Sequence, residues 1–263
     1  MKFFFRLFYK ICSAYVLLVW ALSISSSIHA QNSSVHPKVI VMAEANGIHR
    51  PFADSAIIVL KKLAIQNNFT IDYIENAEKI NEQFLSQYRL FIQLDYPPYG
   101  WSDTAKSAFE KYIKEGRGGW IGFHHATLLG EFDGYSIWPC FSSFMGGIRW
   151  KNYIAGFASA KVNIEKADHP VMKGLPASFV IGKEEWYTYD KTPRPNVQVL
   201  ASVDESTYKP ETSIKMGDHP VVWINPDMKA RNVYIFMGHH GRLFDDPNYR
   251  LLFTNAVMWA IEK

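Results

Sequence analysis

Apolar runs and helical periodicities alternate along the first half of the chain. Consecutive apolar residues predict buried strands, and apolar residues that recur every three or four positions predict helices. The strands expected on this basis span residues 38–44, 69–74, 89–95 and 120–123, and the helices between them span 53–64, 77–85 and 103–116. Because strand and helix alternate throughout, residues 38–126 are predicted to form a parallel, doubly wound α/β sheet with right-handed crossovers.

The second half of the chain has a less regular pattern. Strands are predicted at 156–164, 197–203, 221–224 and 233–237, and Asp246-Pro247 opens a closing helix that runs to Ile261. That helix is apolar on most sides, so we expect it to pack against the sheet. Since there is no internal repeat, low-complexity tract or linker, residues 36–263 are predicted to form a single domain.

The N-terminal segment has a different composition from the rest of the chain. Lys2, Arg6 and Lys10 form a basic start, residues 11–24 are apolar, and small residues follow up to Ala30. This order predicts a secretory signal peptide over residues 1–30, cleaved after Ala30, and hence a periplasmic or secreted protein. The alternative is an uncleaved membrane anchor, although the apolar run is short for a spanning helix.

The net charge of the mature chain excludes some partners. The 263 residues contain 28 Lys+Arg and 25 Asp+Glu, and the signal region holds three of the basic residues and no acidic one, so the mature chain is neutral. Neutrality gives no ground for binding to nucleic acid or to an anionic membrane. After cleavage only Cys140 remains, which excludes an internal disulfide; within its aromatic surroundings this thiol is expected to pack as a small hydrophobe.

Histidines follow three of the predicted strands. His49 comes after the first strand, His124 and His125 follow the fourth, and His239 and His240 follow the last. Parallel strands present their carboxyl ends at one edge of a sheet, so these imidazoles are expected around one pocket, within roughly 10 Å of each other. Imidazoles in such a place can transfer protons or ligate a divalent metal ion, for which His49, His124 and His239 are the candidate ligands.

The segment from Gly122 to Ala126 resembles a nucleophile elbow in which His124 stands where serine or cysteine would be. Gly122 and Ala126 are the small residues that a sharp strand-to-helix turn requires. Because imidazole is a poor lasting nucleophile, His124 is predicted to act as a general acid, a general base or a ligand. The alternative is a pair of histidines that close a strand for packing.

Two further groups of residues have side chains suited to binding a sugar. Glu184 and Glu185 lie beside Tyr187, and since adjacent residues on an extended segment face opposite ways, only one of the two carboxylates is expected to face the site. An aromatic segment after the elbow can be a lid that stacks on a sugar or a part of the core; its rings are Trp138, Phe141, Phe144 and Trp150.

Taken in order, these segments resemble the trehalose-utilisation, or ThuA-like, family of the class I glutamine amidotransferase-like superfamily. The matching segments cover nearly the whole mature chain and include Gly47-Ile-His49, Gly119–Ala126, Trp138–Gly147, Asp168-His-Pro, Glu184–Tyr187, His219–Trp223 and Gly238-His239. The resemblance implies a flavodoxin-like, mostly parallel sheet with helices on both faces, and a role in carbohydrate metabolism linked to disaccharides and their 3-keto derivatives. Amidotransferases carry cysteine at the elbow, so His124 excludes glutamine hydrolysis through a thiol.

Two functions fit these observations. The leading hypothesis is an enzyme that acts on a glycoside or 3-keto sugar by hydrolysis, elimination or isomerisation, with a divalent metal ion as an optional cofactor and His124, Glu184 and His239 as catalytic candidates. The substrate-binding candidates are His49, His125, Glu185, Trp138, Tyr187, His219 and His240. The alternative is a non-catalytic protein that binds a small-molecule carbohydrate at the same rim.

Overall fold

A computed structural model describes residues 36–44 and 46–262, and a mixed sheet of nine strands forms its centre. The strands lie in the order β2-β1-β3-β4-β11-β10-β9-β6-β7. Their bounds are β1 (Lys38–Ala43), β2 (Thr70–Ile74), β3 (Leu90–Leu94), β4 (Gly119–Phe123), β6 (Ala158–Ile164), β7 (Ser178–Glu184), β9 (Gln198–Lys209), β10 (Pro220–Ile224) and β11 (Asn232–Ile235). A separate antiparallel pair consists of β5 (Trp150–Tyr153) and β8 (Tyr187–Tyr189).

The sheet has a parallel part and an antiparallel part. Strands β2, β1, β3, β4 and β11 run parallel to one another, as the alternation of strand and helix predicts for residues 38–126. From β11 onward each neighbour is antiparallel. A short loop joins β10 to β11. This loop permits only antiparallel pairing, because a parallel pair would need a crossover of a dozen or more residues.

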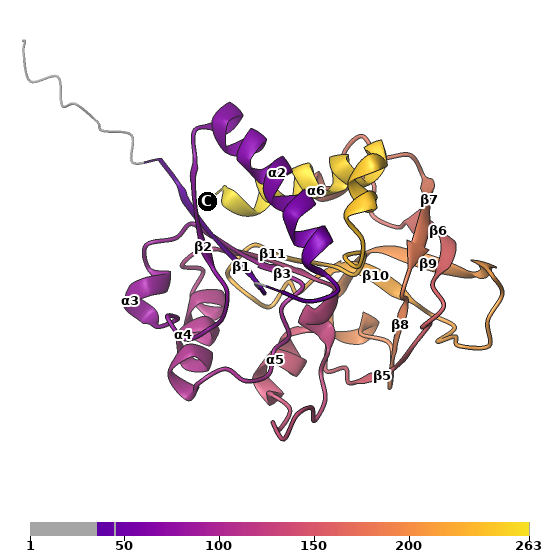
Figure 1. Cartoon of the computed structure of the whole chain (residues 1–263), viewed down its shortest axis with the longest axis horizontal. Helices are drawn as coiled ribbons and strands as arrows, with labels where there is room; N and C mark the ends of the chain where they lie inside the picture. The colour runs from indigo at the N-terminus through magenta and orange to yellow at the C-terminus, as the bar shows by residue number, and fades with distance from the viewer. Residues whose placement is uncertain (1–35, 45, 263) are drawn as a thin grey trace, which may run out of the picture. The chain divides into compact units, whose positions relative to one another are not determined.

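Helices cover both faces of the parallel part. In Figure 1, α2 (Arg50–Asn67) and α6 (Pro247–Ile261) lie above the strands, and α3 (Glu82–Leu85), α4 (Asp103–Lys114) and α5 (Pro139–Phe144) lie below them. This double cover explains why β1, β3, β4, β10 and β11 are buried almost along their whole length. The result is the flavodoxin-like α/β architecture expected from the sequence.

Side chains cap the starts of two helices. Ser102 accepts a hydrogen bond from the backbone N–H of Ala105 at the start of α4. Asp246 does the same for α6, accepting from the N–H groups of Asn248 and Tyr249. α6 is largely buried, as its all-round apolar pattern predicts.

Four short elements do not appear among the predicted ones: α5, β5, β7 and β8. Each has too few residues, or too mixed a burial pattern, to produce a clear periodicity. The predicted signal peptide lies outside the described residues. Within the described part of the chain, no helix has the length and apolar character needed to cross a membrane.

Candidate active site

The predicted elbow follows β4 and places His124 at the carboxyl end of the sheet. A 3-10 helix, η1 (His124–Thr127), begins directly after the strand, and His124 has a φ of 40°, in the left-handed region that residues with a Cβ rarely adopt. A Cβ on Gly122 would lie 3.0 Å from the Cβ of Ala126 and closer still to the Trp120 ring. The turn therefore requires the small residues and stores backbone strain at the imidazole-bearing position.

A buried hydroxyl network holds this elbow in place. The Tyr234 hydroxyl donates to the backbone carbonyl of His124 at 2.9 Å. The Thr127 hydroxyl lies 2.6 Å from that of Tyr234 and 2.7 Å from that of Tyr189. The Thr127 hydroxyl also lies 3.1 Å from the His124 carbonyl, so these buried hydroxyls are satisfied by one another and by the backbone of the elbow.

Three imidazoles meet beside the elbow, as the sequence predicts. Ring centroids lie 5.2 Å apart for His49 and His124, 4.4 Å for His49 and His239, and 5.4 Å for His124 and His239. The shortest contact joins His49 Nε2 to His239 Nδ1 at 2.8 Å. The loops that carry them follow β1, β4 and β11, whose carboxyl ends share one edge because these strands belong to the parallel part.

A carboxylate completes what we call the imidazole–carboxylate cluster: His49, His124, Glu185 and His239. Glu185 lies between β7 and β8, and its Oε2 is 3.3 Å from His124 Nε2 and 3.5 Å from His239 Nδ1. The loop that joins β7 of the antiparallel part to β8 of the separate pair thus contributes to a site built mainly by the parallel part.

Glu184, a predicted acid/base group, lies behind the cluster and contacts backbone amides. Its side chain is fully buried. One oxygen accepts the N–H of Glu185 at 2.9 Å, and the other accepts the N–H groups of Gly238 at 3.2 Å and His239 at 3.4 Å. With both oxygens occupied by backbone amides, Glu184 ties two loops together and positions the side chains of Glu185 and His239.

Asp95 belongs to the site, although the sequence analysis did not single it out. It follows β3 directly, has a φ of 53° and is 3% exposed. Its Oδ1 accepts the N–H of His125 at 3.1 Å, and its Oδ2 lies 3.2 Å from His49 Nδ1. The signal that could have identified it is the one used for the histidines, a polar residue at the end of an apolar strand.

The cluster forms part of the wall of a cavity of about 350 Å³. His49, His125 and Glu185 line it, whereas His124 is fully buried behind them. Three aromatic residues of the small antiparallel pair also line the cavity: Trp150, Tyr153 and Tyr187. Glu44 also lines this cavity, and none of the described lining residues is a lysine or an arginine.

Burial and neighbouring charges shift the pKa values of these groups in opposite directions. Burial, reinforced by the surrounding imidazoles, lowers the pKa of His49 to about 2 and that of His125 to about 3, so both rings are neutral at neutral pH. Burial also disfavours the charged form of His124, but contacts with carboxylates, first of all Glu185, outweigh it and raise its pKa. For Asp95, burial raises the pKa to about 8.

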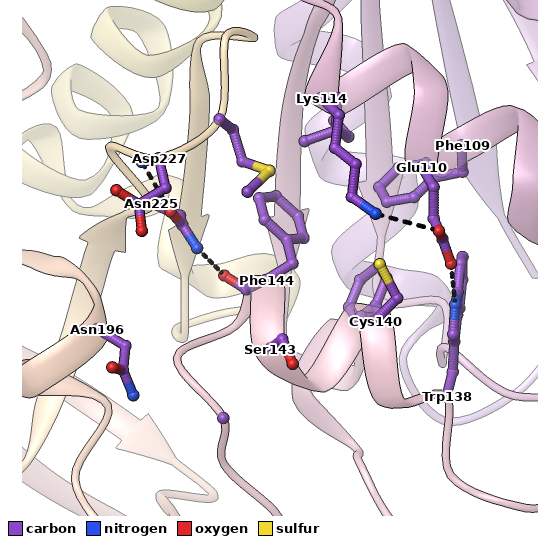
Figure 2. A pocket seen from close by; sticks show the side chains of 14 residues that line it. Phe109, Glu110, Lys114, Trp138, Cys140, Ser143, Phe144, Asn196, Asn225 and Asp227 are labelled. Atoms are coloured by element: carbon purple, nitrogen blue, oxygen red, sulfur yellow. Dashed lines mark hydrogen bonds and ion pairs between the residues drawn. The ribbon is translucent and has the colours of Figure 1, made fainter.

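Trp138, a predicted sugar-stacking residue, lies on another cavity. Figure 2 shows that its indole donates to Glu110 Oε1, at 3.0 Å, beside a cavity of about 530 Å³ between α4, α5 and the loop after β10. Phe141 and Phe144 line the same cavity, so the proposed lid is part of the packing between α5 and α4. Of the predicted lid residues, only Trp150 lines the cavity next to the cluster.

Two other predicted binding residues do not line the cavity next to the cluster. His219 is buried elsewhere, with its Nδ1 2.8 Å from Glu205 Oε1. His240 is half-buried beside His239, with ring centroids 4.5 Å apart. Tyr187, by contrast, lines the cavity and packs against the His124 ring at a centroid distance of 4.5 Å.

Two overlapping sets of side chains have ligand atoms close enough to hold a metal ion. One set is His49, His124, Glu185 and His239, and the other is His49, Asp95, His124 and His125; within each set the ligand atoms lie within 4.8 Å of one another. Imidazole nitrogens and carboxylate oxygens are common ligands of zinc and similar ions.

Comparisons with known proteins agree with the fold and the family resemblance. The family described as trehalose utilisation, ThuA, matches residues 38–260. A ThuA-like protein from Bacteroides uniformis ATCC 8492 is 31% identical, with a TM-score of 0.76 over 88% of this chain and 95% of that chain. A ThuA-like protein from Parabacteroides merdae ATCC 43184 is 18% identical, with a TM-score of 0.61 over 86% of this chain and 90% of that one.

A more distant likeness is to a carbohydrate deacetylase, at 11% identity and a TM-score of 0.52, covering 84% of this chain and 32% of that chain; it shows a shared fold only. The comparison with curated proteins gave no match. Because the family match extends over most of the chain, this protein belongs to the ThuA trehalose-utilisation family.

Proposed function

We propose that this protein is an enzyme that acts on a glycoside or a 3-keto sugar by hydrolysis, elimination or isomerisation in the cavity beside the imidazole–carboxylate cluster. The observation that carries the proposal is the cluster itself, in which side chains from four separate loops meet and two of them, His49 and Glu185, line a cavity. The cavity volume of about 350 Å³ falls within the range of small-molecule sites.

The walls of the cavity favour a neutral carbohydrate as the substrate. Trp150, Tyr153 and Tyr187 offer aromatic faces on which the apolar side of a pyranose ring can stack. The carboxylates of Glu44 and Glu185 can accept hydrogen bonds from sugar hydroxyl groups. The family's description as trehalose utilisation supports this substrate class.

Glu185, predicted to bind the substrate, takes over the catalytic role predicted for Glu184, because it lines the cavity next to the neutral imidazoles of His49 and His125. In a 3-keto sugar the C–H next to the carbonyl is acidic. A base that removes this proton gives an enolate, which then expels the glycosidic oxygen, and an acid returns a proton to that oxygen. His124 is fully buried, so we assign it a role within the cluster, in contact with Glu185, rather than direct proton transfer to the sugar.

Export to the periplasm or the medium is part of the proposal. The basic, apolar and small-residue regions at the start of the chain support it. The exported protein should begin near Gln31, which intact-mass measurement tests, and a mass that retains residues 1–30 would favour a membrane anchor.

The reaction is tested by incubating the purified protein with glycosides, 3-keto glycosides and acetylated sugars; the last class is included because a carbohydrate deacetylase shares the fold. Glu185→Gln should lower turnover of the active compound about 100-fold or more with unchanged melting temperature. The control is Glu211→Gln, at an exposed glutamate far along the chain from the cluster. Binding without turnover would identify a carbohydrate-binding protein instead, and the absence of both would refute the proposal.

A further inference from the structure

We propose that His49, His124, His239 and Glu185 are the ligands of one divalent transition-metal ion of the zinc type. This inference deepens the proposed function and rests on the same site, because the ion would polarise the bound sugar. Metal binding can nevertheless be measured without any reaction.

The spacing of the four ligand atoms suits a tetrahedral ion. With metal–ligand bonds of about 2.0–2.1 Å, the ligand atoms of a tetrahedral site lie about 3.3 Å from each other. In the cluster, His49 Nε2 and His239 Nδ1 are 2.8 Å apart, and Glu185 Oε2 lies 3.3 Å from His124 Nε2 and 3.5 Å from His239 Nδ1. These three separations bracket the tetrahedral value, and all four ligand atoms lie within 4.8 Å of one another, so binding an ion would draw the remaining pairs closer together.

The outer ring nitrogens of two histidines face acceptor oxygens. His124 Nδ1 lies 3.3 Å from the carbonyl oxygen of Phe236, and an N–H donated there leaves the lone pair of Nε2 directed at the cluster. His49 Nδ1 lies 3.2 Å from Asp95 Oδ2, a buried oxygen that has no hydrogen-bond partner among the described residues. We therefore assign Asp95 to positioning the His49 ligand through this contact.

The alternative set, which includes Asp95 and His125 as ligands, fits less well. Asp95 Oδ1 already accepts the N–H of His125, whereas Glu185 Oε2 faces two imidazole nitrogens of the cluster at 3.3 and 3.5 Å. Two residues of each set line the cavity, His49 and Glu185 in the proposed set and His49 and His125 in the alternative one. An ion bound to the proposed set would thus be within reach of a ligand in the cavity.

The expected chemistry is that of a catalytic metal site. Such an ion acts as a Lewis acid on a carbonyl oxygen or lowers the pKa of a bound water molecule. A 3-keto sugar has a carbonyl oxygen that such an ion could polarise. Hydrolysis of a glycoside or an acetylated sugar needs a water molecule, which the ion could activate.

The experiment is a metal titration of the mature protein after treatment with a chelator. The parent protein should bind one equivalent of Zn²⁺, counted by elemental analysis, and Co²⁺ should give the intense visible absorption of a tetrahedral site. His239→Ala and Glu185→Gln should each weaken binding by more than about 100-fold, whereas Asp95→Asn should weaken it by only about 10–100-fold. The matched control is His240→Ala, one position further along, which should leave the affinity unchanged.

Far-UV circular dichroism of each variant separates loss of a ligand from loss of the fold. A parent that binds no metal, or binding that survives His239→Ala, would overturn the inference. Binding abolished by Asp95→Asn but kept by Glu185→Gln would also overturn it, in favour of the alternative set. Turnover of a sugar by the metal-free protein would refute a role for the ion in the reaction and support the proposed function. One bound equivalent of metal without any turnover would support the metal site and refute the proposed function.

Discussion

Replacing Gly238 with alanine should force apart the two loops that carry His124 and His239. A Cβ at position 238 would lie 2.9 Å from the Cβ of His124 and 3.3 Å from the Cβ of Phe123. Ordinary contacts of this kind begin at 3.4 Å, so the loops must separate by about 0.5 Å. Both neighbouring atoms are attached directly to the backbone, and no flexible side chain can relieve the contact.

The expected cost is that of overpacking a well-filled core, about 1–3 kcal/mol of unfolding free energy. Urea denaturation measures it as a lower midpoint at an unchanged m value. The control is Gly182→Ala in β7, where an added Cβ meets nothing within 4 Å. That variant should change the unfolding free energy by no more than about 0.5–1 kcal/mol, and in the stabilising direction if the reduced freedom of the unfolded chain dominates.

The same substitution should also impair the site. A shift of about 0.5 Å reaches the limit within which catalytic and ligand geometries must be held. Zn²⁺ affinity and any sugar turnover should therefore fall at temperatures where Gly238→Ala is still folded. The reasoning is refuted if Gly238→Ala is as stable as Gly182→Ala and binds metal as the parent does.

Thr127→Val should destabilise the elbow by about 1–3 kcal/mol in chemical denaturation, because two buried tyrosine hydroxyls lose a partner at 2.6–2.7 Å; Thr127→Ser keeps the hydroxyl and should cost less. Arg194 lowers the pKa values of Glu165 and Asp218, so its stabilising effect is full above the unfolded carboxyl pKa of about 4 and is lost as the pH falls through the lower folded values. Arg194→Ala should thus lower the free energy of unfolding at neutral pH by no more than about 1 kcal/mol, because the groups are partly exposed. The melting temperature should fall accordingly at neutral pH and stay unchanged in strong acid. Trp138→Phe should leave KM and kcat for any sugar unchanged in steady-state kinetics, and a raised KM would return Trp138 to the site.

The parallel half of the fold could be read from the sequence because its signals are local. An apolar run such as β4 predicts a strand by itself, and Gly122 and Ala126 predict the turn that follows it. The meeting of His49, His124 and His239 was also predictable, because the carboxyl ends of parallel strands always share an edge.

The remaining features of the site depend on contacts between segments that are distant in the sequence, and local sequence patterns do not predict them. Which of Glu184 and Glu185 enters the cluster depends on backbone amides of the β11 loop, more than 50 residues away in sequence. Trp150 reaches the cavity, and Trp138 does not, because β5 pairs with β8 whereas α5 packs on α4. Sequence periodicity thus determined the strands, the helices and the edge of the sheet that carries the site. Which side chains enter the site depends on the energies of contacts between distant segments, and these energies cannot be inferred from any one segment alone.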